Sequence, residues 1–238
     1  MGNLAFCAIA IIAIFVPSTA LYVATTTPPL LDVPTFSLAT RSSNSWPSKN
    51  NMNILTYATP VSVKPVRMWA IGLFKGTQSH ENFKKTGQAV LQMLGPKHIP
   101  LVKLLGGSSG RDTDKADSCK KLGLGWEPLE TASDTDTDTD TASCSFSVLP
   151  GCVTYICLKQ HGALIDCGGH DVAICTVEEM FVSGSGSGGD ELEAIEAYED
   201  KDKYGGGGGG LQGLQGLQTR ELREKGVITA QGRVADAD

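Results

Sequence analysis

Apolar runs separated by turn residues dominate the middle of the chain. The clearest is 66–74 (VRMWAIGLF), which is almost continuously apolar and predicts a buried strand. Shorter runs rich in β-branched, aromatic and aliphatic residues predict further strands at 54–58, 89–94, 153–158, 163–166 and 171–177. Many short strands with few helices are typical of a β-barrel or a β-sandwich. The pattern therefore predicts a mainly β protein with helical insertions.

Helix signals lie between these runs. Ser79 stands where it would cap a short helix that continues through Lys85 and ends at Gly87. One or two helical turns are expected over 98–105, and an amphipathic helix over 115–122. Together these elements predict a folded body from about residue 52 to 182.

A short apolar run, 4–16 (LAFCAIAIIAIFV), opens the chain. It is shorter than a membrane span and has the length of the hydrophobic core of a signal peptide. Small residues follow it, although no Lys or Arg precedes it. We therefore expect a signal peptide at 1–20, cleaved near Ala20, and no membrane attachment of the mature form.

Residues 21–51 are rich in Thr, Ser, Pro and Asn, and Asp32 is the only acid among them. This composition is similar to a plastid transit peptide, and a signal peptide followed by such a segment predicts delivery to a plastid. The alternative is secretion with a disordered N-terminus in the mature protein. In both cases the segment lies outside the predicted body.

Low-complexity segments interrupt and follow the body. An acidic repeat at 134–141 (DTDTDTDT) predicts a loop insertion, and 183–218 combines glycine-rich linkers with an acidic stretch. The tail at 219–238 regains complexity, and we expect it to dock back on the body.

Net charge and cysteine spacing exclude some classes of function. A net charge of -6 argues against a nucleic-acid binder that neutralises phosphates. The cysteines form no C-x-x-C pair, and H-E-x-x-H fails at Lys84, so no metal site is predicted. Six cysteines remain once Cys7 leaves with the leader; disulfides would suit a secreted protein, but free thiols are the preferred interpretation.

Three segments of the body resemble the flavin reductase-like, FMN-binding split-barrel family. They are 53–65 (NILTYATPVSVKP), 69–83 (WAIGLFKGTQSHENF) and the pair 149–155 with 165–171 (LPGCVTY and IDCGGHD). They are similar to the opening strand and loop, the strand with its phosphate loop and helix start, and the late strand pair with its G-x-H turn. Part of the tail, 222–234, is also similar to an extension of some members.

The resemblance implies a homodimeric split β-barrel with FMN near the subunit interface and NAD(P)H as electron donor. The family match assigns the phosphate to the turn formed by Lys75, Gly76, Thr77 and Ser79, where an ammonium, hydroxyls and helix amides converge. From the residues alone, an ordinary strand-to-helix turn is the simpler interpretation.

Further cofactor contacts follow from the same resemblance. The candidates around the flavin ring and the helix start are Asn53, Thr56, Ala58, Thr59, Asn82 and His170. Ala58 replaces a serine that is common in the family and so lacks a hydroxyl donor. For the others a structural interpretation stays open: β-propensity for the threonines, and turn or cap roles for the asparagines and the histidine.

The predicted function is an FMN-binding, NAD(P)H-dependent flavin reductase or related oxidoreductase. Hydride transfer to a flavin needs positioning and electrostatics rather than a catalytic acid–base residue, so no catalytic side chain is assigned. The alternatives are a non-catalytic FMN-binding module and a structural dimer that has lost the site.

Overall fold

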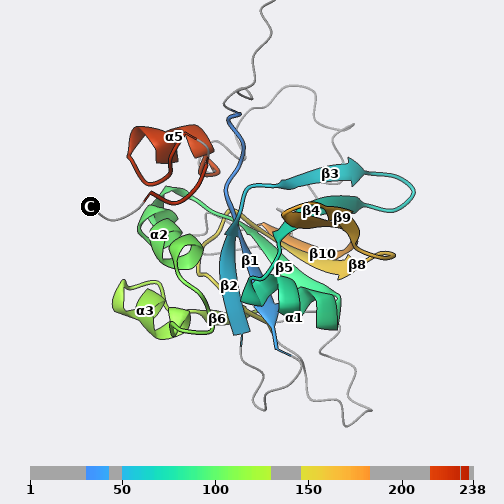
Figure 1. Cartoon of the computed structure of the whole chain (residues 1–238), viewed down its shortest axis with the longest axis horizontal. Coiled ribbons are helices and arrows are strands. Elements are labelled where there is room, and N and C mark those ends of the chain that lie inside the picture. Colours follow the sequence, from blue (N-terminus) through green and yellow to red (C-terminus); the bar gives the residue numbers. More distant parts are fainter. Residues whose placement is uncertain (1–30, 43–49, 130–145, 183–214, 231, 236–238) are drawn as a thin grey trace, which may run out of the picture.

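We describe the fold from a computed structural model of the chain (Figure 1). The described residues are 31–42, 50–129, 146–182, 215–230 and 232–235. The predicted signal peptide, the acidic repeat and most of the glycine-rich linkers lie outside these residues.

Ten strands and four helices are assigned in the described part of the chain. The strands are β1 (Phe36–Arg41), β2 (Asn50–Leu55), β3 (Ala58–Ser62), β4 (Met68–Phe74), β5 (Gln88–Met93), β6 (Glu127–Leu129), β7 (Phe146–Val148), β8 (Thr154–Gln160), β9 (Ile165–Cys167) and β10 (His170–Val182). The helices are α1 (Gln78–Thr86), α2 (Ile99–Gly107), α3 (Lys115–Lys121) and α5 (Thr219–Glu224), and a 3₁₀ turn, η1 (Pro96–His98), leads into α2.

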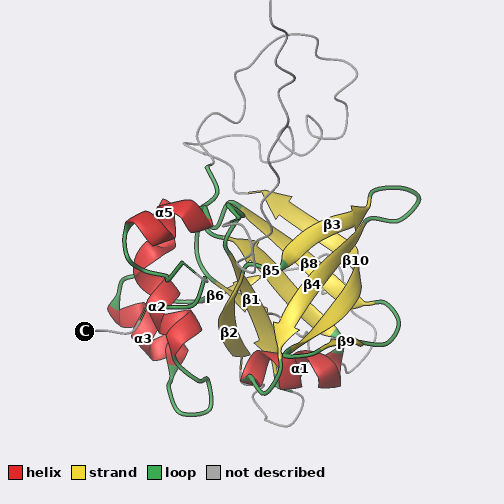
Figure 2. Ribbon diagram, turned by 45° about the horizontal axis from the view of Figure 1, so that its top comes forward, coloured by secondary structure: helices red, strands yellow, loops and turns green. Residues whose placement is uncertain are grey.

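One curved antiparallel sheet forms the centre of the molecule (Figure 2). Its strand order is β2-β1-β5-β8-β10-β4-β3, with β9 paired to β10, while β6 and β7 form a separate two-stranded sheet. The long strand β10 pairs with both β8 and β4, and its pairing with β8 shifts register between Val177 and Glu179. Such a bulge bends a strand and increases its twist, which suits a sheet that curls into a half-barrel.

Apolar cores lie on both faces of this sheet. Strand β5 shows the arrangement: Val90 joins a core with α2, α3 and α5, whereas Ala89 and Leu91 point into a core that includes Phe83 of α1. In Figure 2, α2, α3 and α5 cover one side of the sheet, and α1 lies across one end of its curved part. Because β5 is buried on both faces, residues 89–91 are apolar without alternation, and Gln92 is buried as well.

The folded body begins earlier than the predicted residue 52. Strand β1 lies within the segment that was expected to be transit-like or disordered, and it pairs with both the edge strand β2 and with β5. Its polar residues misled the prediction, because Ser37 and Thr40 are fully buried. The Thr40 hydroxyl bonds the carbonyl of Asn51 at 3.3 Å, so this polar group has a partner inside the protein.

The other predicted elements agree with the structure, with two corrections. The strand expected at 54–58 is broken: β2 ends at Leu55 and β3 begins at Ala58. Helix α1 is capped by Thr77 rather than by Ser79, because the Thr77 side chain accepts the amide hydrogen of His80. Gly87 ends the helix as expected, with φ of 66°.

The C-terminal tail docks on the body, as the sequence predicted. Leu217 and Leu222 are buried in the core under α2 and α3, so the docked segment begins just before the predicted boundary at 219. The amide of Thr35 donates to the carbonyl of Leu217, and the Thr219 hydroxyl donates to the carbonyl of Leu31. The tail therefore holds the residues immediately before β1.

The described cysteines are free thiols (Cys119, Cys152, Cys157, Cys167 and Cys175). Burial raises the pKa of Cys152, Cys157 and Cys175 to about 12, so these side chains stay protonated and unreactive at neutral pH. No helix within the described ranges has the length and apolar character needed to cross a membrane.

Candidate functional site

Three segments that are distant in sequence meet at the end of β4. Strand β10 runs antiparallel to β4 and places His170 directly opposite Phe74. The loop between β2 and β3 reaches the same place, because the amide of Gly72 donates to the carbonyl of Tyr57 at 2.7 Å. The turn after β4 is joined to the β9–β10 turn by the Lys75 amide, which donates to the carbonyl of Gly169.

Aromatic rings form the surface of this junction. The His170 ring lies between Tyr57 and Phe74, with centroid distances of 5.3 Å and 5.2 Å. Tyr57 is 63% exposed and Phe74 is 57% exposed. Exposed aromatic side chains that cluster often mark a ligand or partner surface, so these rings offer a surface for contact with an aromatic ligand.

The turn after β4 presents backbone donors beside these rings. Gly76 has φ of 81°, and a Cβ built there would meet no atom within 4 Å, so the backbone is open to close approach. Thr77 caps α1: its hydroxyl accepts the amide hydrogen of His80 and donates to the carbonyl of Phe74, so this hydroxyl already has two partners. The amides of Gln78 and Ser79 have no acceptor among the described residues, as expected for a helix amino terminus.

Lys75 is held by two carboxylates from the β9–β10 hairpin. Its Nζ lies 2.8 Å from Asp166 Oδ2 and 3.3 Å from Asp171 Oδ1. The hydrogen bond with Asp166 is the main cause that raises the pKa of Lys75, and Lys75 in turn lowers the pKa of Asp166. The side chain of Asp166 is 76% exposed, so this ion pair is open to solvent and exchangeable.

Asp171 also binds His80 on the first turn of α1. His80 Nε2 lies 2.7 Å from Asp171 Oδ2, and the Asp171 side chain is only 13% exposed. This hydrogen bond, followed by the Lys75 contacts, lowers the pKa of Asp171 and keeps it ionised at neutral pH. His80 Nδ1 is buried without a hydrogen-bond partner in the described structure.

An open hollow of about 610 Å³ adjoins this charged group. It is lined by Lys75, His80, Lys84, Gln160, Ala163, Leu164, Asp166 and Asp171. Two lysines face two carboxylates, so the charges in the hollow nearly balance.

The residues predicted from the sequence divide into two groups. Lys75, Gly76, Thr77 and His170 come together at the junction, and Thr56, Ala58 and Thr59 flank its Tyr57. The side chains of the other three predicted residues make hydrogen bonds within the protein instead: Asn53, Ser79 and Asn82.

Each of these three has an identifiable role within the protein. The Ser79 hydroxyl accepts from Asn51 Nδ2, and Asn82 Nδ2 donates to Thr40 Oγ1, so both side chains tie α1 to the sheet. Asn53 Oδ1 accepts the amide of Ile54 on the same strand.

The sequence prediction missed Tyr57, Phe74, Asp166, Asp171 and the role of His80. Tyr57 and Phe74 lie in apolar runs and resemble core residues. Asp171 adjoins the predicted His170, which is the one available signal. The contacts of Asp171 with Lys75 and His80 depend on the pairing of β10 with β4, and the sequence does not reveal this pairing.

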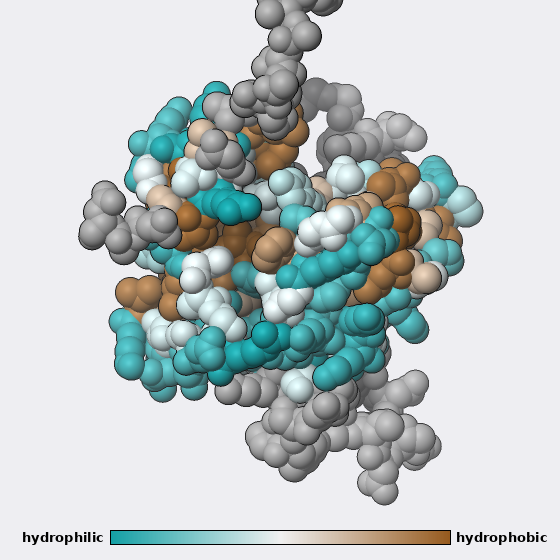
Figure 3. All heavy atoms as spheres, in the orientation of Figure 1, coloured by the Kyte–Doolittle hydropathy of each residue, from teal (hydrophilic) through white to brown (hydrophobic). Residues whose placement is uncertain are grey.

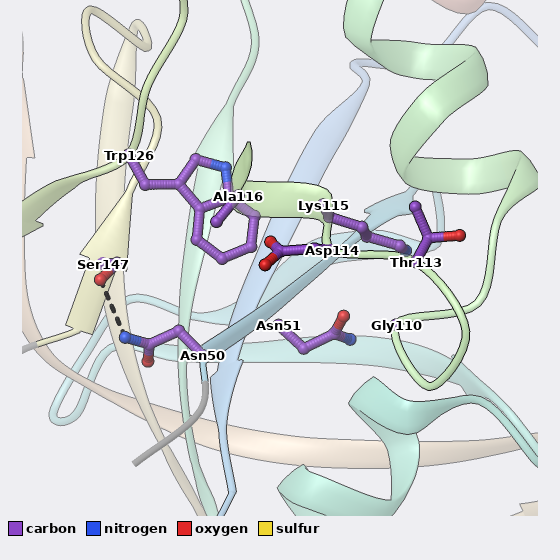
Figure 4. Close-up of a pocket in the computed structure, with 9 residues that line it drawn as sticks. All are labelled: Asn50, Asn51, Gly110, Thr113, Asp114, Lys115, Ala116, Trp126 and Ser147. Carbon is purple, nitrogen blue, oxygen red and sulfur yellow. Dashed lines mark hydrogen bonds between the residues drawn. The ribbon is translucent and has the colours of Figure 1, made fainter. Parts of the chain in front are cut away.

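A second hollow, of about 230 Å³, lies between β2 and the segment 110–126, and Figure 4 shows its lining. Asn51, which lines it, donates to the predicted residue Ser79. Asn50 Nδ2 donates to Ser147 Oγ at 2.8 Å, Trp126 lies on the same side as Ser147, and Asp114 lies nearer the centre of the view. None of the site residues predicted from the sequence lines it. No cluster of three or more potential metal-ligating side chains was found within the described ranges.

Comparison with known proteins identifies the class of this fold. Residues 39–196 match the flavin reductase like domain, which is well over half of the chain. The chain belongs to this family. No match was found among curated proteins.

Solved structures agree on the fold at low sequence identity. Flavoredoxin from Methanosarcina acetivorans superposes with a TM-score of 0.54 at 12% identity, covering 69% of this chain and 76% of its own. An FMN-binding protein from Thermus thermophilus gives 0.52 at 15% identity, covering 69% and 80%. An NADH:FAD oxidoreductase from Streptomyces globisporus gives 0.50 at 13% identity, covering 64% and 77%. The predicted mainly β split-barrel fold is thereby confirmed.

Proposed function

We propose that this protein binds FMN at the junction of β4, β10 and the β2–β3 loop, and that it reduces the flavin with NAD(P)H. The observation that carries the proposal is an exposed aromatic surface beside a turn that has free amides and a lysine. Family membership supports a flavin as the ligand, and one structural neighbour is an FMN-binding protein while another is an NADH:FAD oxidoreductase.

The residues present fit both halves of FMN. The open backbone at Gly76 and the free amides of Gln78 and Ser79 suit a phosphate, and Lys75 supplies positive charge. A phosphate would compete with the exposed Asp166 for Lys75. Tyr57, Phe74 and His170 would hold the ring system by stacking.

The bound flavin would supply the capacity to accept a hydride. The chain's own contribution is positioning and electrostatics: the exposed rings offer apolar faces and edges that would contact a planar cofactor, and Lys75 opposes the phosphate charge. No side chain is proposed to move a proton.

A visible absorbance spectrum tests the proposal. The purified full-length protein, mixed with FMN and dialysed, is expected to retain flavin absorbance, and anaerobic NADH or NADPH is expected to bleach it. Retained flavin that neither nucleotide bleaches would instead favour the non-catalytic binding module. No retained flavin and no binding of FMN in titration would contradict the proposal.

We propose further that the protein is a homodimer through the β3–β4 face. Apolar side chains gather there on the right of Figure 3, and the exposed ones include Val61, Val63 and Val66. A contiguous apolar surface of this kind is typical of an interface, and a second copy would also cover the aromatic junction. Light scattering is expected to give twice the chain mass, and Val63→Asp is expected to shift it toward the monomer.

Plastid delivery stays a proposal that rests on the leader composition. The structure adds one constraint on it: the Leu31 carbonyl accepts hydrogen bonds from Thr219 and Arg223, and Asp32 accepts the amide hydrogen of Arg220. A processing protease should therefore cut before Leu31. N-terminal sequencing of the protein isolated from its source is expected to give a start between Ala20 and Leu31, and a start beyond β1 would contradict this.

A further inference from the structure

One carboxylate fastens both ends of the turn after β4. Asp171 Oδ1 contacts Lys75 at 3.3 Å, and Asp171 Oδ2 contacts His80 at 2.7 Å. Lys75 precedes the turn residues 76–79, and His80 follows them. Asp171 itself is carried by β10, where it lies opposite Leu73 of β4.

We propose that Asp171 is a positioning residue that holds the turn after β4 in the shape needed to receive the flavin phosphate. The proposal rests on the proposed function and adds a residue to it. Asp171 does not touch the ligand; it acts through Lys75 and through the first turn of α1. Fixing these donors in advance lowers the entropy lost on binding.

Only a carboxylate can make both contacts. Lys75 and the Nε2–H of His80 are both donors, so position 171 must supply two acceptor oxygens. The side-chain amide of an asparagine supplies only one acceptor oxygen. If Asn at this position turned its NH₂ toward His80, the imidazole would need its hydrogen on Nδ1, which is buried and has no acceptor in the described structure. If the NH₂ faced Lys75, it would meet an ammonium. In either orientation one end of the turn is released.

Asp166 provides a matched control. It also pairs with Lys75 and carries the same charge, but it is 76% exposed, and in the described structure it makes no ion pair with His80. Neutralising either Asp166 or Asp171 removes one negative charge beside Lys75. A purely electrostatic role would make both Asn variants bind FMN more tightly, whereas a positioning role separates them.

The test compares FMN with riboflavin, which lacks the phosphate. Dissociation constants of the full-length protein are measured by quenching of flavin fluorescence. Asp171→Asn is expected to bind FMN about tenfold more weakly, the effect of losing one charged hydrogen bond, with riboflavin binding unchanged. Asp166→Asn is expected to bind FMN at least as tightly as the wild type.

A second variant guards against misfolding of the first. His80→Leu leaves Asp171 and Lys75 in place and releases only the helix end, so FMN affinity is expected to fall several-fold and riboflavin affinity to stay the same. Equal losses for both flavins, or equal losses in the two Asn variants, would overturn the positioning role. A wild-type protein that binds neither flavin would overturn the proposed function itself. Wild-type binding of FMN together with unchanged FMN binding by Asp171→Asn would overturn only the positioning role.

Discussion

Two lysines in this protein stand in opposite surroundings. Lys75, at the turn after β4, has a side chain that is 33% exposed and faces two carboxylates, which raise its pKa. Lys115, on α3, is 4% exposed and donates to the carbonyls of Met52 at 2.9 Å and Leu105 at 2.7 Å. Burial lowers the pKa of Lys115 to about 8.

The difference separates a charge that can change partners from one that cannot. Lys75 can leave an exposed carboxylate for a ligand, because solvent screens the pair that it leaves. Lys115 ties α3 to β2 and to the end of α2, and moving it would strand two buried carbonyls. The first region is suited to binding, and the second holds the helices on the sheet.

The largest expected effect is on the free energy of unfolding, and it concerns the core between the sheet and the helices α2, α3 and α5. Leu222→Ala removes a side chain that is 1% exposed and packs α5 against the body, so the free energy of unfolding is expected to fall by about 3 kcal/mol. Urea denaturation measures this. Leu122→Ala is the control, because Leu122 is 52% exposed and the same change there should have little effect. Equal losses in both variants would contradict the docked position of α5.

Lys115 is expected to leave a signature in the pH dependence of stability. Between its folded pKa of about 8 and the unfolded value near 10.5, the unfolded chain binds more protons, so this residue makes the free energy of unfolding rise with pH. Relative to Lys115→Met, the wild type is expected to gain about 1 kcal/mol from pH 7 to pH 9.

Urea titrations at several pH values measure this gain, and the comparison with a variant cancels the buried cysteines, whose pKa values near 12 act in the opposite direction above pH 9. Lys103→Met, at an exposed position on α2, serves as the control. A flat difference between wild type and Lys115→Met would show that Lys115 is not buried as described.

Lys75 is expected to affect binding far more than stability. Lys75→Met leaves the core intact, so the midpoint of urea denaturation should hardly change, whereas FMN affinity is expected to fall about tenfold because a charged contact to the phosphate is lost. Riboflavin binding should be unaffected. Lys159→Met, which removes another exposed lysine with one acidic partner, is the control. A loss of FMN binding equal in both variants would remove Lys75 from the site.

Local patterns predicted most of the elements but failed at β1. The apolar run that became β4 and the glycine that ends α1 are local signals, because burial and left-handed backbone each demand particular residue types. Strand β1 (FSLATR) carries Ser37 and Thr40 into the core, and its partners come from elsewhere in the chain, so nothing local distinguishes it from a polar leader.

The sequence predicted only part of the candidate site. The turn after β4 and His170 were identified from the resemblance of their segments, and the structure brings them together. Ser79 and Asn82 belong to the same motif, yet their side chains turn toward Asn51 and Thr40, because the face of α1 that meets the sheet is decided by packing.

The sequence by itself determined the class of fold, most of the turns and the segment that carries Lys75, because these depend on residue size, polarity and backbone freedom along the chain. Only the tertiary structure decided that Asp171 holds Lys75 and His80 together, that Tyr57 and Phe74 face outward around His170, and that Lys115 is a buried link. The physical reason is that the contacts of Asp171 and His170, and the bond from Lys115 to Met52, join segments tens of residues apart. The register of β10 against β4 and the packing of α3 on β2 bring these segments together.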